Sequence, residues 1–502
     1  MDWDISLPAV SLNFLTQVSP QFLFNITYGA IVISPMMGGE YTLVIALAAY
    51  LNFITIARNR QFDEVAKICL AGFIISLFAS LVLLLVHWDV MIAESGQPNQ
   101  TLIGVGWFAI AFMIIDAVRF QVAYYKINLQ DFAKFTLYLI LVSILVKMIG
   151  IYFSASEVGI IQFLQTASRS ILLVDLNPNH ADNVVIFQIA VLSWIVFLLW
   201  ENNDLRLRSL IVAATVCSYM IYLLIVINSR AAFFGLCVAF IAALMLNAKK
   251  LSLLRIVLIL TGLISVTFFL PDSVKSRFQL AGAQLYEIVN QYGTTPKHTL
   301  SARHHDPELR KEIIETLSNR DLSGSTGQRI LNLCYDGEYA GGLSDKYKID
   351  ANFSYRLFLQ LDGYNLWRKH PYFGHGNYDR ISLIRNYSTV DICRIGLFSH
   401  LHNHYLDLMV RGGIFALASF LILSGLLLYL VAKDWTASDR SASLRYLPVL
   451  MVLIYLFVEN LFDISFHRYA PLSAVLFGLS VILSTNLNYG FVNTDNRAAH
   501  EF

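Results

Sequence analysis

The sequence predicts an all-α, polytopic integral membrane protein with about 12 transmembrane helices and one large helical loop outside the cytoplasm. Of the 502 residues, 56% are hydrophobic and only 14% are charged, whereas roughly a quarter of the residues in a soluble domain are charged. The apolar residues also collect in runs long enough for a helix to cross a bilayer, which takes about 20 residues. Lipid is therefore the expected solvent for most of the chain.

The charge distribution excludes one class of partner. The net charge is +1 without any basic run, so the electrostatic footprint that nucleic-acid binding requires is missing. The first residues carry Asp2 and Asp4 and no Lys or Arg, so the cationic start of a cleavable signal peptide is not indicated. We expect the first apolar segment to be retained.

The apolar runs give the expected helices in order. Twelve segments are candidates for membrane spans, and they lie near residues 20–36, 41–57, 66–87, 102–124, 133–153, 184–200, 209–227, 231–248, 253–270, 412–431, 447–465 and 471–487. The first two are the least regular, because Pro20, Pro35 and the pair Gly38-Gly39 interrupt them.

The distribution of Lys and Arg orients these segments, because basic residues accumulate in cytoplasmic loops. Alternate connections are basic, with Arg58, Arg60 and Lys67, Lys126 and Lys134, Arg206 and Arg208, Lys249, Lys250 and Arg255, and Lys433, Arg440 and Arg445. The intervening ones are nearly bare of Lys and Arg, at 37–40, 88–101, 154–183, 228–230 and 466–470. Both termini are therefore expected in the cytoplasm.

The topology divides the chain into four parts. Residues 1–270 hold helices one to nine, 271–401 form the large loop, 402–487 hold helices ten to twelve, and 488–502 are a cytoplasmic tail. In a bacterial cell the loop is periplasmic. It is not a plain linker, since Asp306-Pro307 reads as a helix start and a second helix is expected over 352–369, before Pro371.

Two arginines on the outer side of the membrane are candidate anion ligands. Arg230 ends the seventh segment there, against the positive-inside trend, and a guanidinium matches phosphate oxygens in bidentate fashion. Its structural alternative is a helix end that reaches the interface or a salt bridge with a loop carboxylate. Arg356 lies in a loop that has many charges of both signs, so its charge alone favours a functional role less strongly.

The run His400-Leu401-His402-Asn403-His404 lies where the loop meets the membrane. Histidine is the side chain best suited to accept a proton near neutral pH, which makes His402 a candidate base. A helix-capping or interface histidine is the structural alternative. Asn403 is either an N-cap or a residue that orients its neighbour. His400 and His404 have the spacing of helical metal ligands, but no third ligand is indicated and we predict no metal.

Two carboxylates near the outer end of the eleventh segment, Glu459 and Asp463, share a helical face. Ionisable groups inside a membrane are costly and often functional. The pair can hold a hydroxyl of a bound ligand or form salt bridges with Arg468 or Lys147. In the fourth segment, Asp116 and Arg119 are three residues apart, so a helix would let them neutralise each other.

Of the five cysteines, only Cys334 and Cys393 lie in the predicted loop. An oxidising compartment would allow them to form a disulfide, and free thiols are the alternative.

The motifs together resemble those of the O-antigen ligase family. Its members are bacterial membrane glycosyltransferases, and they share a superfamily with the O-antigen polymerases and the pilin oligosaccharyltransferases. The resemblance covers about residues 210–430. It consists of a Ser-Arg pair, an arginine followed by a tryptophan-bearing helix and a Pro-x-x-Gly-x-Gly turn, and a His-Asn pair before a Gly-x-x-Gly. Here these are Ser229-Arg230, then Arg356, Trp367 and 371–376, then His402, Asn403 and Gly413, with Ala416 replacing the final glycine.

The resemblance implies an inner-membrane enzyme that moves a glycan from undecaprenyl pyrophosphate to a hydroxyl of lipid A-core at the periplasmic face. It implies His402 as the base, Arg230 and Arg356 as ligands of the pyrophosphate, and no metal or cofactor. A polymerase would use another lipid-linked glycan as acceptor, and a protein O-oligosaccharyltransferase would use a protein serine. A secondary transporter is the alternative of another class, but no paired Gly/Pro-broken segments of the kind found in transporters are evident.

Overall fold

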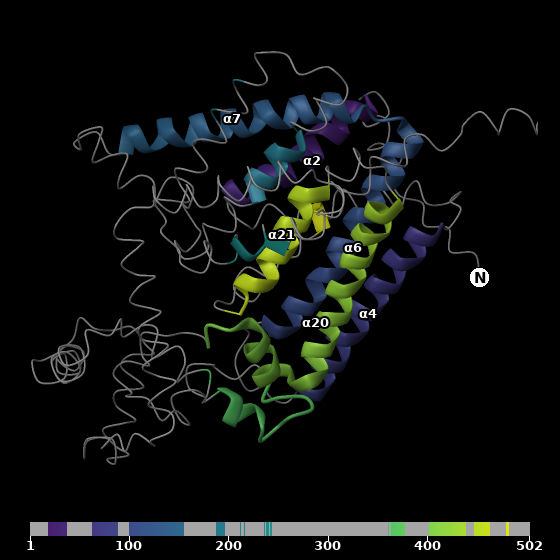
Figure 1. The fold of residues 1–502 in the computed structure, drawn as a ribbon, viewed down its shortest axis with the longest axis vertical. Coiled ribbons are helices and arrows are strands. Elements are labelled where there is room, and N and C mark those ends of the chain that lie inside the picture. Colours follow the sequence, from purple (N-terminus) through teal and green to yellow (C-terminus); the bar gives the residue numbers. More distant parts are fainter. Residues whose placement is uncertain are drawn as a thin grey trace, which may run out of the picture.

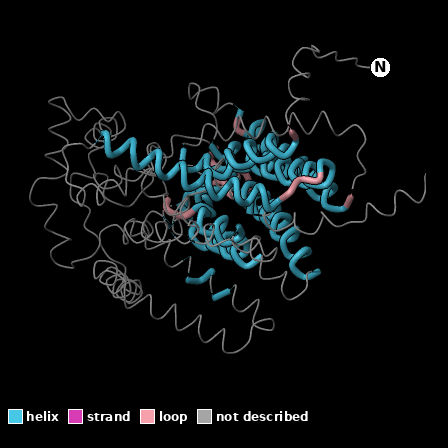
Figure 2. Tube along the Cα trace, turned by 90° about the horizontal axis from the view of Figure 1, so that it is seen from above, coloured by secondary structure: helices cyan, strands magenta, loops and turns pink. Residues whose placement is uncertain are grey.

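The computed structural model describes residues 19–37, 63–88, 100–154, 187–195, 360, 363–376, 401–437, 446–461 and 478–480, with a few positions between 211 and 242. Its regular elements are helices, and Figure 2 shows only helices and connecting turns in this part of the chain. The main ones are α2 (Pro20–Met37), α4 (Glu64–Val86), α6 (Gln100–Tyr125), α7 (Leu129–Ser154), α20 (His404–Ala437) and α21 (Leu447–Glu459). The predicted all-α class is confirmed for these described residues.

Four of these helices contain stretches long and apolar enough to cross a membrane. The stretches are Glu64–Val86, Val105–Ala123, Leu129–Val146 and His404–Lys433, and they coincide with four of the twelve predicted spans. Two shorter apolar helices, Pro20–Ile33 and Pro448–Glu459, lie in two more. The predicted spans at 41–57 and 253–270 lie outside the described residues, so the count of twelve stays a prediction.

The helices α4, α6 and α20 run side by side, and α2 packs against α7 (Figure 1). Small residues let α4 and α6 approach closely, as is usual where lipid rather than water surrounds the helices. A Cβ on Gly72 would lie 2.4 Å from the ring of Phe112. The Ser76 hydroxyl donates to Val105 O (2.6 Å) and accepts from Ala109 N (3.1 Å).

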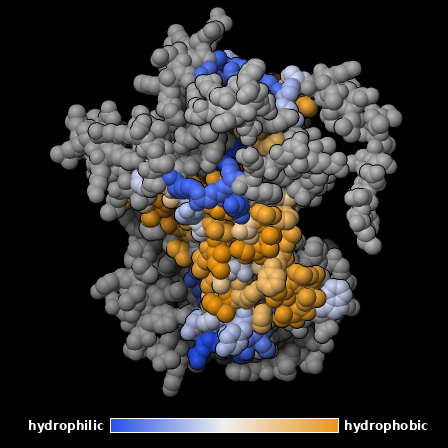
Figure 3. All heavy atoms as spheres, turned by 90° about the vertical axis from the view of Figure 1, so that its right-hand side faces the viewer, coloured by the Kyte–Doolittle hydropathy of each residue, from blue (hydrophilic) through white to orange (hydrophobic). Residues whose placement is uncertain are grey.

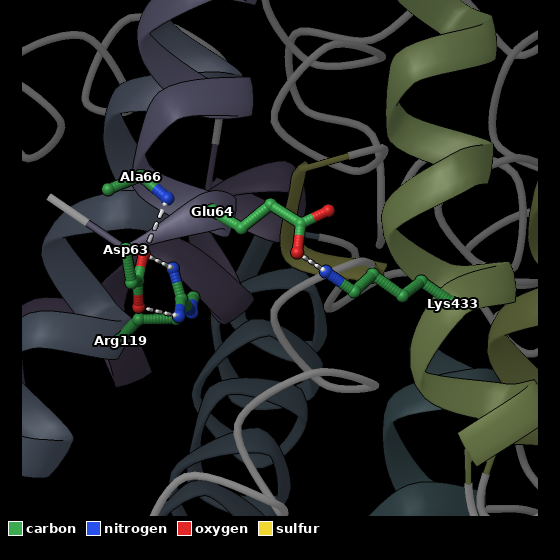
Figure 4. Close-up of polar contacts among 5 residues, drawn as sticks. All are labelled: Asp63, Glu64, Ala66, Arg119 and Lys433. Atoms are coloured by element: carbon green, nitrogen blue, oxygen red, sulfur yellow. Dashed lines mark hydrogen bonds and ion pairs between the residues drawn. The ribbon is translucent and has the colours of Figure 1, made fainter.

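Charged residues tie the helices together at one end (Figure 4). Asp63 caps α4 by accepting from Ala66 N at 2.7 Å, and its other oxygen binds Arg119 of α6 at 2.7 Å. Glu64 binds Lys433, near the end of α20, at 2.5 Å. The start of α4 therefore meets the end of α20, so the two helices are antiparallel. This is the end that the Lys/Arg distribution assigns to the cytoplasm.

Between its two ends the bundle presents an apolar belt. Figure 3 shows a hydrophobic band over the face that includes α4, with hydrophilic residues beyond it on both sides. Large apolar side chains of α4 point outward here, among them Ile74, Phe78 and Leu85. Such a face is unfavourable in water but matches hydrocarbon. The opposite end of the belt holds the beginning of α20 and the residues described next.

Candidate functional site

The predicted His-Asn pair lies at the start of α20. Asn403 is the N-cap of this helix, because its Oδ1 accepts from Leu406 N at 3.0 Å and its carbonyl accepts from Asp407 N at 2.9 Å. His402 immediately precedes the cap and has a φ of 52°, a left-handed conformation that is uncommon outside glycine. The His402 side chain is only 4% exposed. The cap therefore fixes the position of the candidate base just before the start of α20.

The end of α21 meets this motif. The His404 N–H donates to Asn460 O at 2.9 Å, and the Tyr405 hydroxyl donates to Phe457 O at 2.8 Å. These bonds bring Glu459, which is 0% exposed, to the start of α20, where its carboxylate acts electrostatically on Tyr405. The structure therefore groups His402, Asn403 and Glu459 around one helix junction.

The segment before the glycine-rich turn also holds this motif. Gln360 donates from Nε2 to the His402 carbonyl at 3.2 Å. Gly363 packs so closely on Leu401 that a Cβ would lie 2.7 Å from the leucine side chain. Gln360 and Gly363 thus hold the backbone on the N-terminal side of Asn403. The described part of the predicted helix at 352–369 therefore contacts the segment that carries the candidate base.

The helix α20 is broken at Gly413, where φ is 65° and ψ is −164°. A break leaves the carbonyls before it and the N–H groups after it without helical partners. The turn at residues 371–376 supplies partners for the carbonyls. His375 N donates to Val410 O and Gly376 N donates to Arg411 O, each at 2.8 Å.

The same turn accepts from the second part of the helix. Ile414 N donates to Pro371 O at 2.8 Å and Phe415 N donates to Tyr372 O at 3.1 Å. Close approach explains the glycine of the turn, since a Cβ on Gly374 would lie 2.4 Å from the backbone of Arg411. The Pro-x-x-Gly-x-Gly motif and the Gly412-Gly413 pair are therefore two halves of one junction.

Two histidines fix the turn from outside α20. His87, which follows α4, bonds through Nε2 to Phe373 O at 2.7 Å, and His375 bonds through Nε2 to Leu366 O at 2.9 Å. A carbonyl can only accept, so both rings carry the proton on Nε2. Burial lowers the pKa of His87, opposed by its bond to Phe373, and burial also lowers the pKa of His375. The neutral form is thereby favoured in both.

A buried ion pair in the first part of α20 was not predicted. Arg411 Nε lies 3.0 Å from Asp407 Oδ2, and both side chains are almost wholly buried. Charges in a membrane protein carry a desolvation cost and often mark functional sites. The spacing of four residues beside the His-Asn motif is the signal that could have revealed the pair. Both charges act electrostatically on His404, whose ring packs on that of Phe420 with 5.1 Å between the centroids.

The remaining predicted residues are not placed by the structure. Arg230, Arg356 and Asp463 lie outside the described residues, as do His400 and both loop cysteines, Cys334 and Cys393. Their proposed roles stay predictions.

The fold and the site define a helical membrane protein in which the buried polar residues of the candidate site gather at one end of an apolar bundle. The model of the O-antigen ligase family matches residues 215–421. This match confirms the resemblance seen in the motifs, and it indicates a bacterial inner-membrane glycosyltransferase of the ligase or polymerase type. It covers less than half of the chain. No curated protein matches the sequence.

Proposed function

We propose that the protein transfers a glycan from undecaprenyl pyrophosphate to a hydroxyl of lipid A-core at the periplasmic face of the inner membrane. The observation that carries this proposal is the placement of His402 inside the matched segment, directly before the Asn403 cap and two residues from His404, which bonds to Asn460 next to Glu459. A buried histidine at the outer end of a membrane helix is suited to meet a hydroxyl while water, the competing nucleophile, is excluded.

In the proposed reaction, His402 accepts the proton of the acceptor hydroxyl as its oxygen attacks the anomeric carbon of the donor sugar. The bond from that carbon to the pyrophosphate oxygen breaks on the opposite face, so the configuration inverts and the lipid pyrophosphate leaves with the bonding electron pair. Arg230 and Arg356 bind the leaving pyrophosphate and stabilise its developing charge. The donor already stores the driving force, so the proposal assigns no metal or cofactor.

The neighbouring charges have supporting roles in this proposal. Glu459 is buried one residue from the contact between Asn460 and His404, a position from which it can orient the base or hold a sugar hydroxyl. Asp463 would serve on the same face of the helix. Asp407 and Arg411 neutralise each other within α20. In this proposal their ion pair holds a polar segment of the helix between the base and the turn.

Transport is a less suitable function, although α20 is a broken helix. In transporters, the ends of broken helices face the substrate or the coupling ion. Here the protein's own turn occupies the backbone groups at the break, through four hydrogen bonds between residues 371–376 and 410–415. The break therefore serves to dock the turn.

Lipopolysaccharide from a deletion strain, separated on a gel, tests the function and distinguishes the acceptor. Loss of all capped forms is the result expected of a ligase, whereas a surviving single-repeat band indicates a polymerase. An unchanged pattern, together with glycosylation of a pilin in the parent strain only, points to the protein O-oligosaccharyltransferase alternative. Unchanged lipopolysaccharide without such a substrate contradicts transferase activity.

A further inference from the structure

Exposed cations and aromatic rings gather on the segment that leads into the glycine-rich turn. Arg368, Lys369 and His370 follow one another and are all exposed. The Tyr372 side chain beside them is 72% exposed, and that of Tyr364 is 47% exposed. Residues 363–376 contain no Asp or Glu. We call Trp88, Tyr364, Arg368, Lys369, His370 and Tyr372 the basic aromatic rim.

The rim lies at the edge of the apolar belt. Leu85 and Val86, the last apolar residues of α4, and Trp88 just beyond them are all about half exposed or more. The bond from His87 to Phe373 O holds the turn against this end of α4. Figure 3 shows that the hydrophobic band gives way to hydrophilic residues beyond it. Cations and rings thus stand where hydrocarbon-facing surface ends.

This arrangement matches the headgroup layer of a bilayer. Tyrosine and tryptophan prefer the membrane–water interface because each combines an apolar ring with a polar group. Arginine and lysine close to the surface attract anionic lipids, and the guanidinium fork fits phosphate oxygens. We propose that the basic aromatic rim binds the phosphate headgroups of anionic phospholipids in the leaflet at this end of the bundle.

The binding would set the depth of the candidate site. The turn that carries Tyr372 is bonded to α20 on both sides of Gly413, and the first part of that helix begins at the Asn403 cap. An anchor at the rim therefore fixes the height of the junction relative to the plane of lipid phosphates. This inference does not depend on the proposed transferase activity.

Photo-cross-linking tests the rim with the full-length chain in vesicles of equal parts phosphatidylglycerol and phosphatidylcholine. Tyr372 is replaced by p-benzoylphenylalanine, and the ratio of the two lipid adducts is read by mass spectrometry. We expect phosphatidylglycerol to be enriched roughly fivefold per cation at low ionic strength, and the enrichment to decline as salt is added. The same probe at Ile74, in the middle of the belt, should return the composition of the vesicle.

Two variants complete the test. Arg368→Gln with Lys369→Gln should bring the adduct ratio at position 372 back towards that of the vesicle, because the cations are lost while the aromatic side chains remain. Lys67→Gln, at the other end of α4, is the control and should leave the enrichment unchanged. An unbiased ratio with both cations present, enrichment that survives their removal, or adducts to protein alone would overturn the proposal.

Discussion

Replacing Gly413 with alanine perturbs the junction between α20 and the turn at residues 371–376. The backbone at Gly413 has a φ of 65° and a ψ of −164°, a region essentially restricted to glycine, and holding another residue there costs about 1–3 kcal/mol. The added Cβ would also lie 2.1 Å from the Tyr372 carbonyl oxygen. The turn must therefore move away from the helix.

That movement lengthens the bonds from Ile414 N to Pro371 O and from Phe415 N to Tyr372 O. Each is worth about 0.5–1.5 kcal/mol, so with the backbone strain Gly413→Ala should destabilise the protein by about 2–6 kcal/mol. Whole domains are stable by only about 5–15 kcal/mol. A clear fall in the thermal unfolding temperature of the detergent-purified protein is the expected result, together with reduced accumulation in membranes.

Gly425→Ala is the matched control in the same helix. This glycine is helical and exposed, and a Cβ there would meet no atom of the described residues within 4 Å. Alanine favours a helix over glycine by about 1 kcal/mol, so this variant should be as stable as the parent or more so. Equal unfolding temperatures for Gly413→Ala and Gly425→Ala would refute the reasoning about the junction.

Of three further predictions, two concern His87 at the same end of the bundle and one concerns the topology of the chain. His87→Leu removes the donor to Phe373 O and should lower the free energy of unfolding by about 1–3 kcal/mol. His87→Gln keeps an N–H donor and should retain more thermal stability. Equal losses of stability in the two variants would exclude the hydrogen bond as the cause. Because burial lowers the pKa of His87 and His375 from 6.5, the unfolded chain binds more protons, so stability should be constant above that pH and fall below it. His87→Gln should flatten this dependence, and a pH profile that rises on acidification would contradict it. With single cysteines at Gly293 and Ser438, an impermeant reagent on intact cells should label only the first, and the reverse would overturn the topology.

Much of the fold could be predicted because its signals are local. Apolar runs indicated the helices at 64–86, 100–125 and 129–154 to within a few residues, and the Asn403 cap was one of two readings of its residue type. The start of α20 was predicted eight residues too late, at 412 rather than 404. The Gly-Gly pair looked like the boundary of a helix, whereas the turn satisfies the backbone there and lets the helix begin earlier.

Contacts between segments that are distant in the sequence could not be predicted. Helical spacing suggested Asp116 as the partner of Arg119, whereas the structure shows the arginine bound to Asp63, which lies 56 residues away at the start of another helix. The role of His87 could not be predicted from the sequence, because its partner is a backbone carbonyl of a segment 286 residues later. A backbone acceptor has no side-chain identity, so no pattern of residue types can indicate it.

Transfer by purified His402→Ala, from an undecaprenyl-pyrophosphate-linked glycan to an acceptor, tests the central claim most directly. Loss of a general base should reduce turnover by about 10²–10⁴-fold and leave donor affinity largely intact, because a base acts in the transition state. Arg230→Lys, which keeps the charge but loses the bidentate fork, should instead weaken donor binding as well as rate. Transfer by His402→Ala at the parent rate would contradict the assignment of the base and leave Glu459 or Asp463 as the next candidates.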